Sequence, residues 1–518
     1  MSLRDVLRLL LAAGLIWLVL LLPARPGQVT GWLTPELPVI LLALALLGRG
    51  LRPVAVVALV LLAAHKIADL AMVSALGRGF NLRADLPLIE AGMRLIAGSV
   101  GVPGAVAVAL GAGVALAAIA LALWWACGVW ARARGRKGLA ALAVMAAVAL
   151  VAVQMGAIRA DAARYAAGRA ALFAETIREL RAFRAAAAHD PFAGAAGLLG
   201  AIDRDVLVIF VESYGRTSFD TPLYADTHLP TLRRAETALA GAGLAMRSGF
   251  LTAPTRGGQS WLSHATLASG LWIADQTRYR TALVSDRQGL FHHAQAAGFR
   301  TAAVMPAITL PWPEASRMGF DTVLPARDLG YRGLPFNWVT MPDQFTMAAL
   351  DRLLRDDSGD GRDDRRLFAQ VALISSHAPW VPVPHLLDWS DIGDGRVFDQ
   401  MAQAGDPPEL VWRDRDRVRD QYRQAVDYSL QVVASYAALH AADPPLILVI
   451  GDHQTAPRIA LDERPDVPFH VIGPEALVAR TAGWGLHPGL IPPPGAQPLP
   501  MDRLRDLILG SFGGGPPA

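Results

Sequence analysis

The sequence contains a single cysteine in 518 residues, Cys127, which lies inside an apolar run. One cysteine cannot form a disulfide within the chain. It also excludes a metal site built from several thiolates and a redox-active cysteine pair. The compartment in which the protein works must therefore be deduced from its membrane topology.

A surface of basic residues interleaved with aromatic residues is also missing. The 48 Lys and Arg residues are scattered among 45 Asp and Glu residues, so the net charge is only +3. Proteins that bind nucleic acid concentrate positive charge on one face, and we expect no nucleic acid among the partners. Hydrophobic residues make up 53 % of the chain and the mean hydropathy is +0.33, which favours a membrane protein.

The excess of apolar residues lies in the first third of the chain, where five stretches are predicted to cross a membrane. Their lengths are near the ~20 residues that a helix needs to span a bilayer. No A-x-A-like cleavage site follows the first stretch, so we interpret it as a retained anchor. The predicted spans are 6–22, 29–47, 54–76, 106–129 and 139–158.

Basic residues in the short loops predict the orientation of these spans. The loop between the fourth and fifth spans holds Arg132, Arg134, Arg136 and Lys137. Because such loops stay in the cytoplasm, we expect a cytoplasmic N-terminus in a bacterial inner membrane, with everything after residue 158 in the periplasm. The predicted parts are a five-helix transmembrane domain (1–158), an amphipathic connecting helix and linker (159–203) and a periplasmic domain (204–518).

The third span carries three ionisable residues, His65, Lys66 and Asp69. On a helix, His65 and Lys66 lie on the same side as Asp69 and can pair with it. Ionisable residues inside a membrane are functional candidates, and an ion pair between packed helices is the alternative. The sequence leaves both interpretations open.

From about residue 204, apolar runs alternate with helical patterns. Several runs are continuous, which is typical of strands buried on both faces of a parallel sheet. The alternation predicts an α/β sandwich with a mostly parallel central sheet. The predicted strands are 206–213, 245–251, 301–307, 367–376, 446–453 and 469–474, and the predicted helices are 229–240, 289–297, 342–355 and 415–442.

Polar residues follow these runs at the carboxyl ends of strands, where ligands bind in such sheets. Glu212 follows the first run, His377 follows the fourth, and Asp452 and His453 follow the fifth. Taken alone, Glu212 could be an acid at a helix start and His377 an ordinary loop histidine. An acid and an imidazole directly after a buried strand are costly without a partner, so Asp452 and His453 favour a metal site.

The segment TRGGQSWLSHATLASG (255–270) follows the second run, and Ser260 stands where its glycine turn enters a helix. Free N–H groups and the helix dipole at such a position can hold an anion. Ser260 can therefore be a nucleophile that a metal ion activates, whereas a simple helix cap is the alternative. Thr255 is a rival hydroxyl five residues earlier.

The ordered motifs VESYG, TRGGQS, SSHAPW and GDHQ resemble the alkaline phosphatase and sulfatase superfamily. With five spans, the chain is most similar to its membrane-bound group, which contains lipoteichoic acid synthases, phosphoethanolamine transferases and phosphoglycerol transferases of periplasmic glucans. The resemblance implies that 204–518 is a sulfatase-like catalytic domain. It also implies one divalent ion, Zn or Mn, held by Glu212, Ser260, Asp452 and His453.

The resemblance further assigns roles in a reaction. Ser260 takes the place of the nucleophile, and His377 that of the histidine that steadies the phosphate or protonates a leaving group. Arg256 and Arg458 lie near these motifs and could either bind a phosphate oxygen or be structural. The implied reaction transfers phosphoethanolamine or phosphoglycerol from a membrane phospholipid to a glycan or lipid acceptor through a phosphoserine enzyme. We expect a monomer.

Several positions depart from the family pattern. Most of these transferases carry threonine where Ser260 stands, and Gln454 stands where a small residue is more usual. Ser260 is followed by Trp261 and Leu262, without the x-Pro-x-Arg of sulfatases, so formylglycine chemistry is not expected. A membrane-anchored phosphodiesterase or sulfatase-type hydrolase is the alternative function, and a non-catalytic relative is the third.

Overall fold

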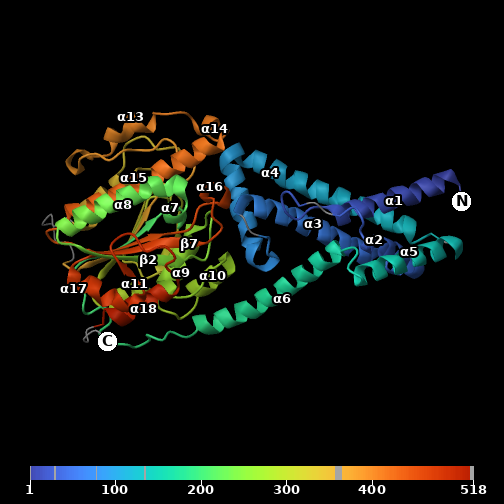
Figure 1. Cartoon of the computed structure of the whole chain (residues 1–518), viewed down its shortest axis with the longest axis horizontal. Helices are drawn as coiled ribbons and strands as arrows, with labels where there is room; N and C mark the ends of the chain where they lie inside the picture. Colours follow the sequence, from blue (N-terminus) through green and yellow to red (C-terminus); the bar gives the residue numbers. More distant parts are fainter. Residues whose placement is uncertain (1, 29–30, 77–78, 134–135, 356–363, 514–518) are drawn as a thin grey trace. The chain divides into compact units, whose positions relative to one another are not determined.

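The computed structural model describes residues 2–28, 31–76, 79–133, 136–355 and 364–513 (Figure 1). The chain forms two compact units, unit 1 (Met1–Arg181) and unit 2 (Ala182–Ala518). The predicted connecting helix forms as α6 (Asp161–Ala187), which contributes residues to both units.

Unit 1 is helical, and a helix forms in each predicted span. The segments Arg52–Ser74 and Gly101–Trp130 are long and apolar enough to cross a membrane, and Gly138–Gln154 is apolar but shorter. The count of five spans stays a prediction. The helices are α1 (Leu3–Leu21), α2 (Glu36–Leu47), α3 (Arg52–Leu76), α4 (Leu82–Trp130) and α5 (Arg136–Gln154).

The second predicted span is shorter than expected. Helix α2 has 12 residues, or about 18 Å at 1.5 Å per residue, against a hydrocarbon core of about 30 Å. Pro35 occupies its N-cap position and Pro38 lies in its first turn, where a proline removes no intrahelical hydrogen bond. Residues 29 and 30 of this span, and Arg134 of the basic loop, lie outside the described residues, and the orientation stays a prediction.

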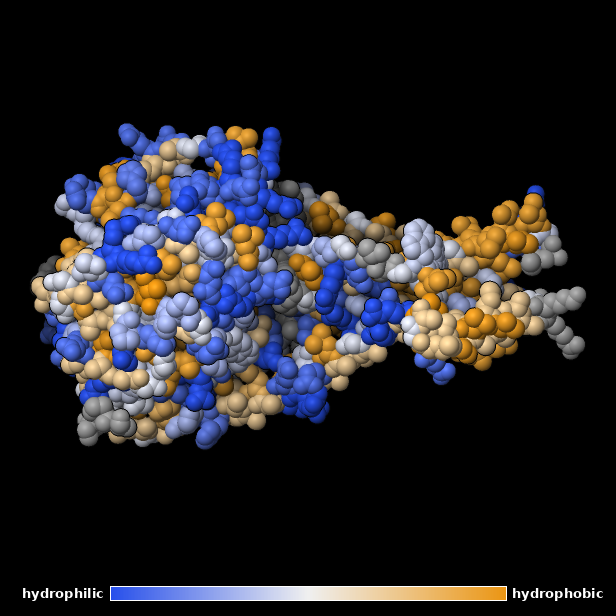
Figure 2. All heavy atoms as spheres, viewed as in Figure 1, coloured by the Kyte–Doolittle hydropathy of each residue, from blue (hydrophilic) through white to orange (hydrophobic). Residues whose placement is uncertain are grey.

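The helices of unit 1 have an apolar outer surface as well as an apolar core. Ile16, Leu44, Ala63 and Cys127 pack together inside. Large apolar side chains also point outward, and Figure 2 shows them gathered over these helices. An apolar exterior of this extent is typical of a surface that contacts lipid.

The ionisable residues of the third span do not form the pairs predicted from their spacing. Asp69 lies 3.2 Å from the guanidinium of Arg169 on α6, and it accepts a hydrogen bond from Tyr165 at 2.5 Å. Lys66 instead donates to the carbonyl oxygen of Leu20 at 2.8 Å. Asp69 thus does not pair within α3, and its ion pair joins α3 to α6, which agrees with the alternative of an ion pair between packed helices.

Unit 2 is built around one nine-stranded sheet with the order β4-β3-β5-β1-β6-β7-β2-β8, and β9 pairs with β2. All six predicted strands are present, and three short ones, β4, β8 and β9, were not predicted. The strands are β1 (Val206–Val211), β2 (Ala245–Thr252), β3 (Arg300–Met305), β4 (Thr322–Pro325), β5 (Leu367–Leu373), β6 (Leu446–Gly451), β7 (Asp466–Gly473), β8 (His487–Pro488) and β9 (Leu499–Pro500).

The sheet is mixed, and every strand except β7 and β8 runs in one direction. Strand β2 is antiparallel to β7, and β7 is antiparallel to β6, so β2 points the same way as β1 and β6. The carboxyl ends of β1, β2, β5 and β6 therefore lie along one edge of the sheet.

Helices cover both faces of this sheet (Figure 1). Leu207 and Ile209 of β1 face one core, whereas Val208 and Phe210 face the other. The predicted α/β sandwich is thus present. One face carries α8 (Pro222–Gly241), α12 (Asp343–Leu350) and α15 (Arg415–Leu439), and the other carries α9 (Ser260–Ser269), α11 (Leu290–Ala296) and α18 (Arg503–Ser511).

Candidate metal centre

Glu212, Asp452 and His453 meet where β1 and β6 end. These strands are parallel neighbours, with Val211 opposite Gly451, so the residues that follow them lie side by side. The ligand atoms of the three side chains all lie within 4.8 Å of one another, and all three residues are buried. Two carboxylates and an imidazole at this spacing can share one divalent ion.

Hydrogen bonds orient the donor atoms of this group. Asp452 Oδ1 accepts the N–H groups of Ser213 and His453 at 2.8 and 2.6 Å, which leaves Oδ2 for a ligand. His453 Nδ1 lies 3.1 Å from the carbonyl oxygen of Gln454, so Nδ1 carries the proton in a neutral ring.

The other ring nitrogen of His453 is the best indicator of a metal ion. Nε2 is buried, and although it lies 3.1 Å from Glu212 Oε1, this contact lacks the geometry of a hydrogen bond. Buried nitrogen atoms without a partner are rare, and a metal ion would satisfy this one. The residues therefore fit the divalent ion that the motifs imply.

Burial and mutual charge shift the pKa values of the three side chains. Burial, followed by the charge of Glu212, raises the pKa of Asp452 to about 8. Burial alone would raise the pKa of Glu212, but the positive charge of His453 outweighs it and holds this pKa well below its usual range. Burial opposes ionisation of His453, yet Asp452 and Glu212 raise its pKa to about 9. The two carboxylates thus need a positive charge between them.

Ser260 joins this group through its hydroxyl. Its Oγ donates a hydrogen bond to Glu212 Oε2 at 3.0 Å. The N-cap residue of α9 is Gln259, which has a left-handed backbone (φ 69°) and whose side chain makes no capping hydrogen bond. Ser260 is the first residue of the helix itself. The helix-cap alternative is therefore wrong. Thr255, the rival hydroxyl, donates to the carbonyl of Gly258 at 2.8 Å and closes the glycine turn.

The glycine turn is fixed to the segment that follows His453. The N–H of Gly257 donates to the carbonyl of Gln454 at 2.7 Å, and Arg256 and Gln454 form a β-bridge. Gly257 has a φ of 72°, a conformation that favours glycine. This bridge holds the turn before Ser260 against the loop that carries two of the three ligand residues.

The glycine of the VESYG motif makes room for Gln454. A Cβ atom on Gly215 would lie 1.6 Å from Gln454 Oε1, and a Cβ on Gly451 would lie 1.8 Å from the carbonyl oxygen of Tyr214. Gly451 therefore has no room for a side chain against the backbone that follows β1, and a side chain at position 215 would displace that of Gln454. The unusual glutamine fits here because it packs on a residue without a side chain.

The other predicted site residues, His377, Arg256 and Arg458, lie on the segments that follow β5, β2 and β6. His377 follows β5, is exposed, and its positive charge contributes to the lowered pKa of Glu212. Arg256 donates to the carbonyl of Glu463. Arg458 is exposed on α16 (Pro457–Ala460). Phosphate binding by these three residues stays a prediction.

A buried carboxylate that the sequence did not single out, Asp343, supports the loop before His377. Its Oδ1 accepts the N–H groups of Ile374 and Ser375 at 2.7 and 2.8 Å, and its Oδ2 accepts the hydroxyl of Ser429 at 2.6 Å. Burial raises the pKa of Asp343. An acid at the start of a helix is too common in sequences to predict this role.

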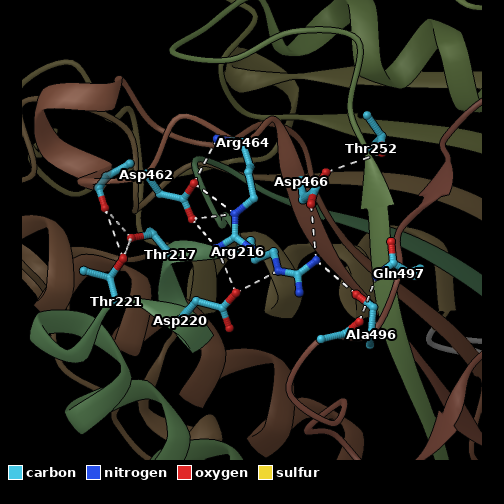
Figure 3. Close-up of polar contacts among 12 residues, drawn as sticks. Arg216, Thr217, Asp220, Thr221, Thr252, Asp462, Arg464, Asp466, Ala496 and Gln497 are labelled. Carbon is cyan, nitrogen blue, oxygen red and sulfur yellow. Dashed lines mark hydrogen bonds and ion pairs between the residues drawn. The ribbon is translucent and has the colours of Figure 1, made fainter.

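A second unpredicted feature is the ion-pair network around Arg216, directly after VESYG (Figure 3). Arg216 contacts Asp220 at 2.9 Å and Asp466 at 3.2 Å. Arg464 contacts the same Asp220 at 2.8 Å and Asp462 at 2.6 Å. The network joins the loop after β1 to the loop between β6 and β7, and these are the loops that carry the three ligand residues.

No family model matches this chain, and no curated protein matches it either. Solved structures do match. Lipoteichoic acid synthase LtaP from Listeria monocytogenes is 13 % identical, with 54 % of this chain and 68 % of that chain covered and a TM-score of 0.37. Phosphoglycerol transferase GacH from Streptococcus pyogenes is 10 % identical, with 57 % of this chain and 74 % of that chain covered and a TM-score of 0.36.

The periplasmic domain of phosphoethanolamine transferase EptC from Campylobacter jejuni is 11 % identical, with 60 % of this chain and 89 % of that chain covered and a TM-score of 0.37. Because the identities and TM-scores are this low, the chemistry has to be deduced from the residues of the site. The solved structures to which this chain is similar thus include a lipoteichoic acid synthase, a phosphoglycerol transferase and a phosphoethanolamine transferase.

Proposed function

We propose that the protein is a metal-dependent transferase that moves phosphoethanolamine or phosphoglycerol from a membrane phospholipid to a glycan or lipid of the cell envelope. The observation that carries this proposal is the hydrogen bond from Ser260 to Glu212 at 3.0 Å, within a buried group that can hold a metal ion. A hydroxyl beside such a group is suited to nucleophilic attack. The four ordered motifs support the same reaction class.

In this proposal Glu212, Asp452 and His453 hold a divalent ion, Zn or Mn, with Ser260 Oγ as a further ligand. When bound, the ion supplies positive charge that favours the ionised hydroxyl. Glu212 orients Ser260 through the hydrogen bond already present.

The proposed reaction has two steps. The ionised Ser260 Oγ, whose proton has been lost to solvent, attacks the phosphorus of the donor, the bond to the diacylglycerol oxygen breaks, and protonated His377 gives that oxygen a proton. The oxygen of an acceptor hydroxyl then attacks the phosphoserine, loses its proton to the imidazole, and releases Ser260. Arg256 and Arg458 bind phosphate oxygens in this scheme, and positioning and charge neutralisation provide most of the catalysis.

We also propose that the protein is a monomer in the inner membrane, with a cytoplasmic N-terminus and unit 2 in the periplasm. The two helical segments that are long and apolar enough to span a membrane support a membrane location, and the basic loop supports the orientation. Ser260 would then share a compartment with its donor and its acceptor.

Full-length protein supplied with a phospholipid labelled in its head group tests the reaction. We expect diacylglycerol and a labelled envelope glycan or lipid, and neither product from Ser260→Ala. Ser263→Ala is the matched control, because Ser263 lies on the same helix and its hydroxyl has no hydrogen-bond partner among the described residues. Undiminished diacylglycerol release by Ser260→Ala would overturn the assignment, and free labelled head group alone would identify a hydrolase.

A further inference from the structure

Unit 1 contains a cavity of about 520 Å³ lined by residues of α3, the beginning of α4 and α6. These three helices are labelled in Figure 1. Its volume is within the range of small-molecule binding sites. The walls consist of Ala, Leu, Ile and Phe side chains apart from four polar residues, His65, Asn81, Tyr165 and Arg169. Such a cavity fits a ligand that is mostly apolar and has one polar part.

Asp69 fixes two of these polar residues from behind. It accepts the hydroxyl of Tyr165 at 2.5 Å and lies 3.2 Å from Nη2 of Arg169. The side chain of Asp69 is 2 % exposed, whereas that of Arg169 is 23 % exposed. An arginine has five N–H donors, and its contacts with Asp69 and the carbonyl of Phe80 do not use all of them. Arg169 can therefore also bind an anionic group inside the cavity.

His65 provides a second donor to the cavity. Its ring lies edge-on to Phe80 and to Tyr165, with centroids 5.4 and 6.4 Å away. It forms no hydrogen bond with any residue in the part of the chain that the structure describes. A ring nitrogen that lines a cavity without a protein partner is available to a ligand.

The apolar wall follows α3 over the depth of one leaflet. On α3 the lining residues run from Ala58 to Ala68, which is about 15 Å at 1.5 Å per residue. The hydrocarbon core of a bilayer is about 30 Å thick. Because α3 contains a segment able to span the membrane, this wall has the length of an acyl chain in one leaflet.

We propose that this cavity binds one phospholipid of the outer leaflet, with an acyl chain beside Ala58, Leu61 and Leu62 and its phosphate near Arg169 and His65. Burial against the apolar walls stabilises the acyl chain of the lipid. The guanidinium of Arg169 donates charge-assisted hydrogen bonds to the lipid phosphate. The site goes beyond the proposed function, since it requires no chemistry at Ser260. In a transferase, a lipid of this class would also be the donor.

Photo-crosslinking tests the position of the lipid acyl chain in the cavity. Full-length Ser260→Ala protein, which does not consume the probe, is placed in nanodiscs with phosphatidylglycerol that carries a diazirine near the end of one acyl chain. We expect crosslinks on α3 and α6. Ala64→Trp, which fills the cavity, should abolish them, and Val57→Trp, on an exposed part of the same helix, should not. Equal labelling of the two variants, or crosslinks spread evenly over the exposed faces of unit 1, would overturn the proposal.

The phosphate contact is tested by Arg169→Gln, with gel filtration to establish that the variant is folded. Labelling by phosphatidylglycerol should fall about tenfold, the value of one hydrogen bond to a charged group. Labelling by a diacylglycerol with the same photoreactive chain should not change. Equal effects on both probes, or no effect on either, would contradict a phosphate site. Because labelling needs no turnover, its failure would leave the transfer reaction untouched.

Discussion

Glu212 is the residue at which the proposed nucleophile and the imidazole meet. One carboxylate oxygen accepts the hydroxyl of Ser260 at 3.0 Å, and the other lies 3.1 Å from His453 Nε2. A single side chain thus accepts the hydroxyl and contributes charge to the candidate metal centre. Its removal should therefore affect metal binding and reaction together.

We predict that Glu212→Gln, which keeps the shape of the side chain and removes its charge, lowers the amount of bound divalent ion. Diacylglycerol release should fall by more than about 100-fold, because changing a residue that only supports a metal ligand already costs up to about 100-fold. Elemental analysis and the lipid assay measure the two effects. Glu475→Gln, an exposed acid at the start of a short helix, is the control and should change neither. Full ion content in Glu212→Gln would exclude this carboxylate as a ligand.

The protonation of Asp452 and His453 makes the stability of ion-free protein depend on pH. Their pKa values rise from 3.8 to about 8 and from 6.5 to about 9. A group with a raised pKa binds more protons in the folded state, so its stabilising contribution is present at low pH and is lost as the pH rises through the folded value. Glu212 has a lowered pKa, so its stabilising contribution is lost when the pH falls into the acidic range and does not change above it.

We therefore expect the Tm of EDTA-treated protein to fall as the pH rises from 6.5 to about 9, the interval between the two pKa values of His453. Zn or Mn should reduce this fall, because the ion replaces the positive charge that deprotonation removes. Thermal melting across this interval, with and without ion, measures both slopes. Identical slopes would show that no ion binds at these residues.

At the scale of elements, the loops after β1 and β6 are joined by the ion pairs of Arg216 (Figure 3). Arg216 and Asp466 have side chains only 6 % and 9 % exposed. Removing one partner of a buried pair leaves an uncompensated charge. Such a change destabilises by about 3–5 kcal/mol, whereas an exposed pair contributes about 0–1 kcal/mol.

Arg216→Met should accordingly lower the Tm of unit 2 and weaken its divalent-ion affinity, because the segments that follow β1 and β6 lose one of the ion pairs that join them. Arg396→Met is the matched control, since Arg396 pairs with Asp394 at 2.8 Å with side chains 63 % and 41 % exposed. Its Tm should stay near that of the unchanged protein. Equal shifts in the two variants would mean that the Arg216 network does not support the site.

At the scale of the whole molecule, the proposed topology separates the N-terminus from unit 2. The single cysteine, Cys127, is buried, so cysteines introduced elsewhere can be labelled selectively. In intact spheroplasts a membrane-impermeant maleimide should label Glu475→Cys and not Ser2→Cys, and lysis should expose both. Labelling of Ser2→Cys before lysis would reverse the predicted orientation.

The sequence by itself was enough to predict six of the nine strands of unit 2 and to single out the residues of its candidate metal centre. The runs that became β1 and β6 are continuously apolar because both faces of the sheet are covered, and burial of this kind leaves a local pattern. Glu212, Asp452 and His453 stand out for the same reason, since they are polar residues directly after buried strands. The glycine turn in the sequence indicated Ser260 as a candidate nucleophile, but it did not predict that Ser260 lies within hydrogen-bonding distance of Glu212.

Only the tertiary structure decided what depends on residues far apart in the chain. The direction of β2, which brings Ser260 to the same edge as Glu212, depends on its pairing with β7 more than 200 residues later. Arg216 meets Asp466, and Asp69 meets Arg169, across segments that are also far apart in the chain. The periodicity of a segment shows which of its faces is buried, but it does not show which other segment covers that face. The ion-pair partners, the direction of β2 and the proposed lipid cavity therefore became visible only in the folded structure.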